Sequence, residues 1–190
     1  MTNFEIYDEL TAAPEARDVL TAISRKAGFV PRIFGLYAAS SVALNALASL
    51  NTAFSASSFT SREREIISIA TSVENHCVYC VAGHSAFANR LGFSSDDLRA
   101  MREGSQLSDA RENVLYGFTR TIAAQRADIP DGALEAFFAA GFTKAHVFEL
   151  LVGMAEKTMT NFASKISRLE IDDEFSEFVW DPARATKDAA

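Results

Sequence analysis

Both cysteines of the chain, and two of its three histidines, lie within residues 74–84, ENHCVYCVAGH. Cys80 follows Cys77 by three positions and His84 follows Cys80 by four, so on a helix the three side chains share one face. The cysteines fall in the first turn of the expected helix, where unpaired backbone N–H groups favour an anion. Such a cysteine ionises more readily to the nucleophilic thiolate, and a nearby histidine can take its proton.

Several kinds of chemistry fit this spacing. A thiolate can attack the O–O bond of a peroxide to give a sulfenic acid, which a second thiol then converts into a disulfide. Cys77, Cys80, His84 and a carboxylate could instead bind zinc tetrahedrally. A thioredoxin-like dithiol needs a neighbouring βαβ pattern, which the sequence does not show. Two buried structural cysteines are the remaining alternative.

The segments around the motif are predicted to be helical almost throughout. Thr60 and Glu63 form a capping-box pattern at the start of one helix, and a second helix begins near Cys77 and ends before Gly92. Ser108, Asp131 and Thr143 are expected to cap later helices. The other helices are expected at 15–26, 33–54 with an interruption at Ser40-Ser41, 94–102, 108–126, 131–141 and 143–168.

No segment alternates in the manner of a strand, so the expected fold is all-α, a single-domain bundle of about seven helices. The domain is expected to cover residues 1–170, with the CxxC motif at 77–80. Residues 171–190 form a tail that carries Phe175, Phe178 and Trp180, which we expect to pack on another surface. A neighbouring subunit is the candidate for that surface.

Composition narrows the classes of function. A length of 190 residues suits one domain, and a net charge of −7 argues against nucleic acid, whose phosphates need a basic face. The acidic N-terminus lacks the features of a secretory signal, and no run of about eighteen apolar residues exists, so no membrane partner is expected. A cytoplasmic location follows by default. There, two cysteines three apart more often bind metal or react than staple the fold.

Five residues in the order E-x(11)-C-x-Y-C-x(3)-H, namely Glu65, Cys77, Tyr79, Cys80 and His84, resemble the alkylhydroperoxidase D-like (AhpD-like) branch of the carboxymuconolactone decarboxylase superfamily. The resemblance covers about residues 25–165. It extends upstream through FVPRIF and TSREREIISIATS and, more weakly, downstream through GALEAFFAAGFTKAHVFEL. The decarboxylase branch lacks the CxxC, so the chain is unlike a lactone decarboxylase.

The resemblance implies a peroxidase-related oxidoreductase that reduces a hydroperoxide. Cys80 would attack the peroxide, Cys77 would resolve the product to a disulfide, and His84 would help to deprotonate Cys80. Glu65 would complete a proton relay with His84, through water. An external dithiol, on a lipoamide- or thioredoxin-like protein, would supply electrons. No cofactor and no metal would be needed, and the subunits would form a trimer or hexamer.

Tyr79 is a further candidate for the relay. This position can be His in the type members of the family, whereas a phenol is a poor base at neutral pH but can still donate a hydrogen bond. A different class of function also fits the sequence. The same disulfide could switch the assembly of a redox-sensing or structural oligomer without any turnover.

Overall fold

The computed structural model describes residues 4–182, which form nine α-helices and one 3₁₀ helix, with no strand in this range. The all-α prediction is confirmed. In chain order the elements are α1 (Pro14–Ala27), α2 (Arg32–Tyr37), α3 (Ser41–Ser55), α4 (Ser61–Glu74), α5 (Val78–Arg90), α6 (Ser95–Glu103), α7 (Ala110–Gln125), α8 (Ala133–Ala139), α9 (Lys144–Ser167) and the 3₁₀ helix η1 (Asp173–Phe178).

The helix boundaries follow local capping chemistry. Thr60 accepts the backbone N–H of Glu63 while the Glu63 carboxylate accepts that of Thr60, so the predicted capping box is confirmed. Ser40 caps α3, and its extended backbone divides the predicted 33–54 segment into two helices. This break is one reason why the described residues hold more helices than the seven expected.

Two predicted caps are wrong by one residue. Asp109, and not Ser108, accepts the N–H of Glu112 at the start of α7. Ser108 instead donates its own N–H to Asp97, 3.0 Å away. Gly132, in the left-handed region with φ of 80°, takes the N-cap position of α8 in place of Asp131.

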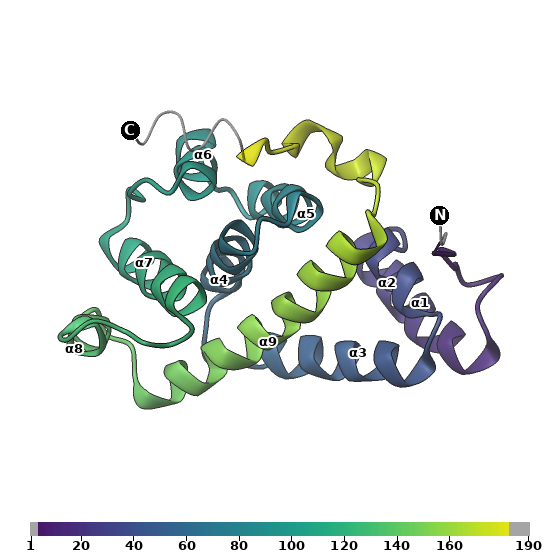
Figure 1. Ribbon diagram of the computed structural model, residues 1–190, viewed down its shortest axis with the longest axis horizontal. Helices are drawn as coiled ribbons and strands as arrows, with labels where there is room; N and C mark the ends of the chain where they lie inside the picture. The colour runs from purple at the N-terminus through teal and green to yellow at the C-terminus, as the bar shows by residue number, and fades with distance from the viewer. Residues whose placement is uncertain (1–3, 183–190) are drawn as a thin grey trace.

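Helix α4 lies at the centre of the molecule, with α5, α7 and α9 packed around it (Figure 1). Its side chains Ile66, Ile67 and Ile69 are fully buried in the main hydrophobic core. Burying each of them contributes about 1.5–3 kcal/mol, so α4 is a rigid support for whatever side chains it carries.

Helix α9 is the longest element, with 24 residues, and it packs against both α3 and α4. Gly153 allows the approach of α3, because a Cβ at this position would lie 2.5 Å from the ring of Phe54. The opposite face of α9 is apolar and exposed along its whole length, with the side chains Phe148, Leu151, Phe162 and Ile166.

The C-terminal segment returns over α5, as Figure 1 shows. Phe175 is 2% exposed and packs on Gly83, where a Cβ would lie 3.1 Å from its ring, and Trp180 is also buried. The described part of the tail therefore packs on its own chain, and its packing on a neighbouring subunit stays a prediction. The rest of the predicted tail, 183–190, lies outside the described residues.

Within residues 4–182, no single helix is long and apolar enough to cross a membrane. Helices α8 and α9 reach that length and composition only together, as a pair bent by 109°.

Candidate functional site

Cys77 is the N-cap of α5, and Cys80 lies in the first turn of that helix. The chain enters through His76, which has a left-handed φ of 51°, and the Cys77 N–H donates to Ser72 O at 2.9 Å. Cys77 Sγ then accepts the backbone N–H of Cys80 at 3.3 Å, as a serine or aspartate cap oxygen would. Both cysteines are free and buried, so the described state is the dithiol.

The two thiols have opposite electrostatic environments. A hydrogen bond from the Cys80 thiol, helped by Ser164 and by the N–H of Cys80, outweighs burial and lowers the pKa of Cys77 to about 7. Burial raises the pKa of Cys80, and the hydrogen bond and charge of Cys77 raise it further. Lys157 and Asn161 act on Cys80 in the opposite direction. The reduced pair therefore ionises first at Cys77.

Glu65 on α4 and His84 on α5 meet directly. Glu65 Oε2 lies 2.8 Å from His84 Nδ1, with side-chain exposures of 18% and 17%. The structure thus brings together the pair that the motif predicted, but by direct contact where a bridging water was expected. The two side chains are also the part of the site that reaches the surface, since both cysteines are buried.

A buried lysine occupies the other side of the imidazole. Lys157 Nζ on α9 lies 2.9 Å from His84 Nε2 and 3.1 Å from Glu156 Oε1. Asn51 on α3 donates to the same carboxylate oxygen at 3.1 Å. Burial opposes ionisation of Glu156, but Lys157, Asn51 and His84 outweigh it and lower its pKa. Helices α3, α4, α5 and α9 therefore share one charged cluster.

Helix α9 carries a polar stripe past the thiols that sequence reasoning missed. Asn161 donates to Ser72 Oγ at 3.1 Å and accepts from Asn75 at 2.9 Å, while Ser164 Oγ lies 3.6 Å from Cys77 Sγ. The signal was present in the sequence. Lys157, Asn161 and Ser164 are spaced by four and three residues, which places these three polar side chains on one face of the helix.

Tyr79 has its hydroxyl committed to the C-terminal segment. The hydroxyl donates to Asp172 Oδ2 at 2.5 Å and accepts the backbone N–H of Ile33 at 3.2 Å. Burial, reinforced by the Asp172 carboxylate, raises the pKa of Tyr79 far above its usual value. Asp172 also accepts the N–H of Arg32, at 3.2 Å. In this arrangement Tyr79 links the C-terminal segment and α2 to α5. Its hydroxyl proton is donated to Asp172 and not to a thiol.

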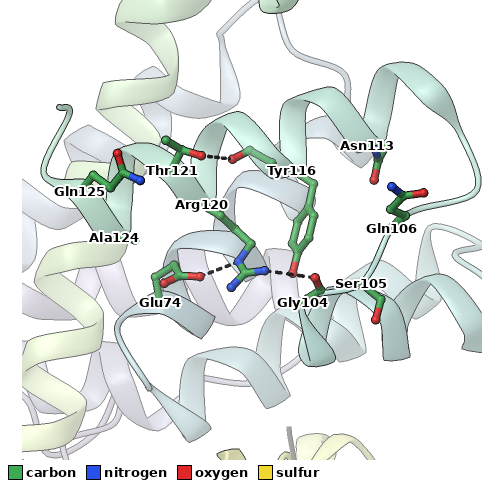
Figure 2. Close-up of a pocket in the computed structure, with 11 residues that line it drawn as sticks. Glu74, Gly104, Ser105, Gln106, Asn113, Tyr116, Arg120, Thr121, Ala124 and Gln125 are labelled. Atoms are coloured by element: carbon green, nitrogen blue, oxygen red, sulfur yellow. Dashed lines mark hydrogen bonds and ion pairs between the residues drawn. The ribbon is translucent and has the colours of Figure 1, made fainter. Parts of the chain in front are cut away.

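An open pocket of about 390 Å³ lies apart from the thiols, at the end of α4 and along α7. In Figure 2, the Arg120 side chain lies between Glu74 on one side and Tyr116 and Gly104 on the other. The Arg120 guanidinium contacts the Glu74 carboxylate and Gly104 O. The pocket shares no lining residue with the thiol site.

The described residues do not form the ligand cluster that a zinc site would need. Among residues 4–182, no group of three or more His, Cys, Asp or Glu side chains is arranged to hold a metal ion. His84, the histidine on the same face of α5 as Cys80, already has Glu65 and Lys157 on its two ring nitrogens.

Residues 42–120 match the carboxymuconolactone decarboxylase family. The matched segment runs from α3 into α7 and contains Glu65, Cys77, Cys80 and His84. The resemblance to the carboxymuconolactone decarboxylase family is therefore confirmed over these residues. Comparison with curated proteins gave no match.

Solved structures show the same fold. A peroxidase-related protein with an AhpD core from Ralstonia eutropha JMP134 superposes with a TM-score of 0.80 at 21% identity, covering 92% of this chain and 96% of that one. A peroxidase-related protein from Silicibacter sp. TM1040 gives 0.77 at 22% identity, with the same coverages of 92% and 96%. The debrominase Bmp8 gives 0.78 at 14% identity, covering 100% of this chain and 99% of that one. At these identities the likeness establishes the AhpD-like fold.

Proposed function

We propose that the chain is a thiol-dependent peroxidase that reduces hydroperoxides, with Cys80 as the attacking thiolate and Cys77 as the resolving thiol. The observation that carries the proposal is the free Cys77–Cys80 pair at the N-terminus of α5, beside the Glu65–His84 contact. The family match and the peroxidase-related proteins of the same fold support it.

The proposed reaction cycle has four steps. Cys77 ionises first, and its thiolate takes the proton of the Cys80 thiol that hydrogen-bonds to it. The Cys80 thiolate attacks the O–O bond, which breaks to give a sulfenic acid and an alkoxide that is protonated to the alcohol. The Cys77 thiol attacks the Cys80 sulfenic acid, forming the disulfide and releasing water. An external dithiol then reduces the disulfide and is itself oxidised.

We propose Glu65 and His84 as the residues that assist ionisation of Cys80. In this structure both nitrogens of His84 are occupied, by Glu65 and by Lys157, so the pair acts on the thiol through Lys157 and not by a direct hydrogen bond. Tyr79 keeps a structural part in the proposal, because its hydroxyl already donates to Asp172.

The proposal includes two protein partners. The first is an external dithiol protein of the lipoamide or thioredoxin kind. The second is another copy of the chain, since the exposed apolar face of α9, with Phe148, Leu151, Phe162 and Ile166, suits a subunit interface. Phe162→Glu should then lower the mass measured by light scattering, whereas an unchanged mass would place the interface elsewhere.

A debrominase is the second candidate function. A relative with that name covers this whole chain, and a variant of it with a cysteine replaced by alanine was solved with 2,3,4-tribromopyrrole. Turnover of this bromopyrrole with release of bromide, and no turnover of hydroperoxides, would favour that chemistry over peroxide reduction.

Steady-state turnover of cumene hydroperoxide with dithiothreitol tests the proposal. Cys80→Ser is expected to abolish turnover. Without dithiothreitol, Cys77→Ser should still consume one equivalent of peroxide but should not form the intramolecular disulfide. His76→Asn, which changes the exposed histidine beside Cys77, is the matched control and should remain active. Unchanged turnover in Cys80→Ser would refute the assignment. A redox-dependent change of oligomer size without turnover would instead indicate a sensor.

A further inference from the structure

Lys157 is a buried cation in contact with His84. Its side chain is 7% exposed, and its neighbour Glu156 is 2% exposed. Bringing such a pair out of water is costly, and a well-packed apolar pair of similar volume would often stabilise a fold equally well. Salt bridges of this kind are therefore weak evidence for a purely stabilising role.

The contact between Lys157 and His84 fixes where the protons lie. At 2.9 Å, Nζ and Nε2 can bond only if one of them donates and the other accepts. Because an aliphatic amine is a stronger base than imidazole, the proton stays on Lys157 and Nε2 accepts. The one imidazole proton then lies on Nδ1 and points to Glu65, 2.8 Å away.

The positive charge of Lys157 acts on the less acidic thiol. Cys80 precedes His84 by one helical turn, so its side chain shares the face of α5 that Lys157 contacts. Lys157 and Asn161 oppose the effect of burial on the pKa of Cys80, whereas the charge of Lys165 lowers the pKa of Cys77. The groups that act on Cys80, directly or through this cluster, come from four helices and their flanking residues: Tyr37 (α2), Glu65 (α4), Tyr79 and His84 (α5) with the N-cap Cys77, Glu156, Lys157 and Asn161 (α9), and Asp172 before η1.

We propose that Lys157 is the positioning residue of the thiol pair: it holds His84 as the neutral tautomer protonated on Nδ1, and its ammonium stabilises a negative charge on Cys80. The cluster has a direction. Glu65 contacts His84, His84 and Glu156 contact Lys157, and the charge of Lys157 acts on Cys80. The proton shared by the two cysteines can then leave Cys80, although Cys77 ionises first. This inference deepens the proposed function and rests on it for its purpose, but its readouts contain no peroxide.

The pH dependence of Cys80 alkylation tests the inference. Cys77→Ser leaves Cys80 as the only thiol of the chain, so iodoacetamide reports Cys80 alone. In this background Lys157→Gln should move the midpoint upward by about one pH unit, which slows alkylation at neutral pH about tenfold. Lys157→Arg should restore most of the rate. Lys144→Gln removes the same charge from the exposed start of α9 and should leave the profile unchanged. A Lys157→Gln profile that superimposes on the parent profile would overturn the inference.

Two further measurements guard against a folding defect. Glu156→Gln with Lys157→Gln removes both buried charges together, so no carboxylate is left unpaired, and it should show the same upward shift with full helical circular dichroism. Nitrogen-15 spectra of the unaltered reduced protein should show His84 protonated on Nδ1 and bare on Nε2 at neutral pH. An imidazolium, or a proton on Nε2, would overturn the inference. Failure of peroxide turnover with these results intact would refute only the proposed function.

Discussion

Two carboxylate–cation pairs, Glu156 with Lys157 and Glu74 with Arg120, differ in their contact with water. The first pair is 2% and 7% exposed, and the second, which lines the open pocket in Figure 2, is 17% and 33% exposed. Water screens the second pair, so its charges have little influence beyond their own contact. The buried pair is screened far less and lies beside the thiols. Burial, more than contact geometry, gives an ion pair influence over its neighbours.

The largest difference is expected on removing one cation from the buried pair. Lys157→Met leaves the Glu156 carboxylate buried without its counter-ion, which should lower the free energy of unfolding by about 3–5 kcal/mol. Urea unfolding followed by circular dichroism measures this loss. Adding Glu156→Leu to Lys157→Met should recover most of the stability. A loss below about 1 kcal/mol in the single variant would mean that the pair is no less screened than a surface pair.

The next effect concerns the imidazole that links the buried pair to Glu65. His84→Leu removes both the contact to Glu65 and the acceptor for Lys157, and it should slow the reaction of Cys80 with hydroperoxide about a hundredfold. Stopped-flow kinetics under single-turnover conditions measure this step. His76→Asn is the matched control, and equal rates in the two variants would remove the charged cluster from the mechanism.

A smaller effect should appear in the pH dependence of stability. The fold lowers the pKa of Cys77 from 9.0 to about 7, so the ionised thiol favours the folded state. The stabilisation by this thiolate is fully present above about pH 9 and is lost as the pH falls through about 7. Reduced protein should gain roughly 2 kcal/mol over this range relative to Cys77→Ser. Parallel curves for the two proteins would contradict the lowered pKa.

The smallest effect is expected at the open pair. Arg120→Met should change the free energy of unfolding by at most about 1 kcal/mol, because Glu74 can regain water. It should also leave the alkylation profile of both thiols unchanged. Urea unfolding and iodoacetamide kinetics check the two statements. A loss of unfolding free energy as large as that of Lys157→Met would contradict the conclusion that burial distinguishes the two pairs.

Local chemistry explains which parts of the site could be predicted. The Thr60 capping box and the helix after Cys77 depend on neighbouring residues, so the sequence indicates them directly. The pairing of Glu65 with His84 was expected only because a family resemblance supplied an interhelical contact that spacing cannot show. Its direct geometry was not foreseen, since one water more or less between two side chains leaves no trace in the sequence.

The unpredicted parts are contacts between distant segments. Lys157 and His84 are 73 positions apart, and Tyr79 and Asp172 are 93 apart. Periodicity indicates which face of a helix is buried but not what it meets. The spacing of Lys157, Asn161 and Ser164 in the sequence indicates that one face of α9 meets polar groups. The tail was expected on another subunit because its aromatic residues need cover, and α5 of the same chain provides that cover.

The most direct test of the proposed chemistry is a free-thiol count on reduced protein before and after one equivalent of an organic hydroperoxide. The account predicts that both thiols disappear together, that mass spectrometry finds a Cys77–Cys80 disulfide, and that a dithiol restores both. Two thiols that persist through the treatment, in protein that remains folded, would contradict it.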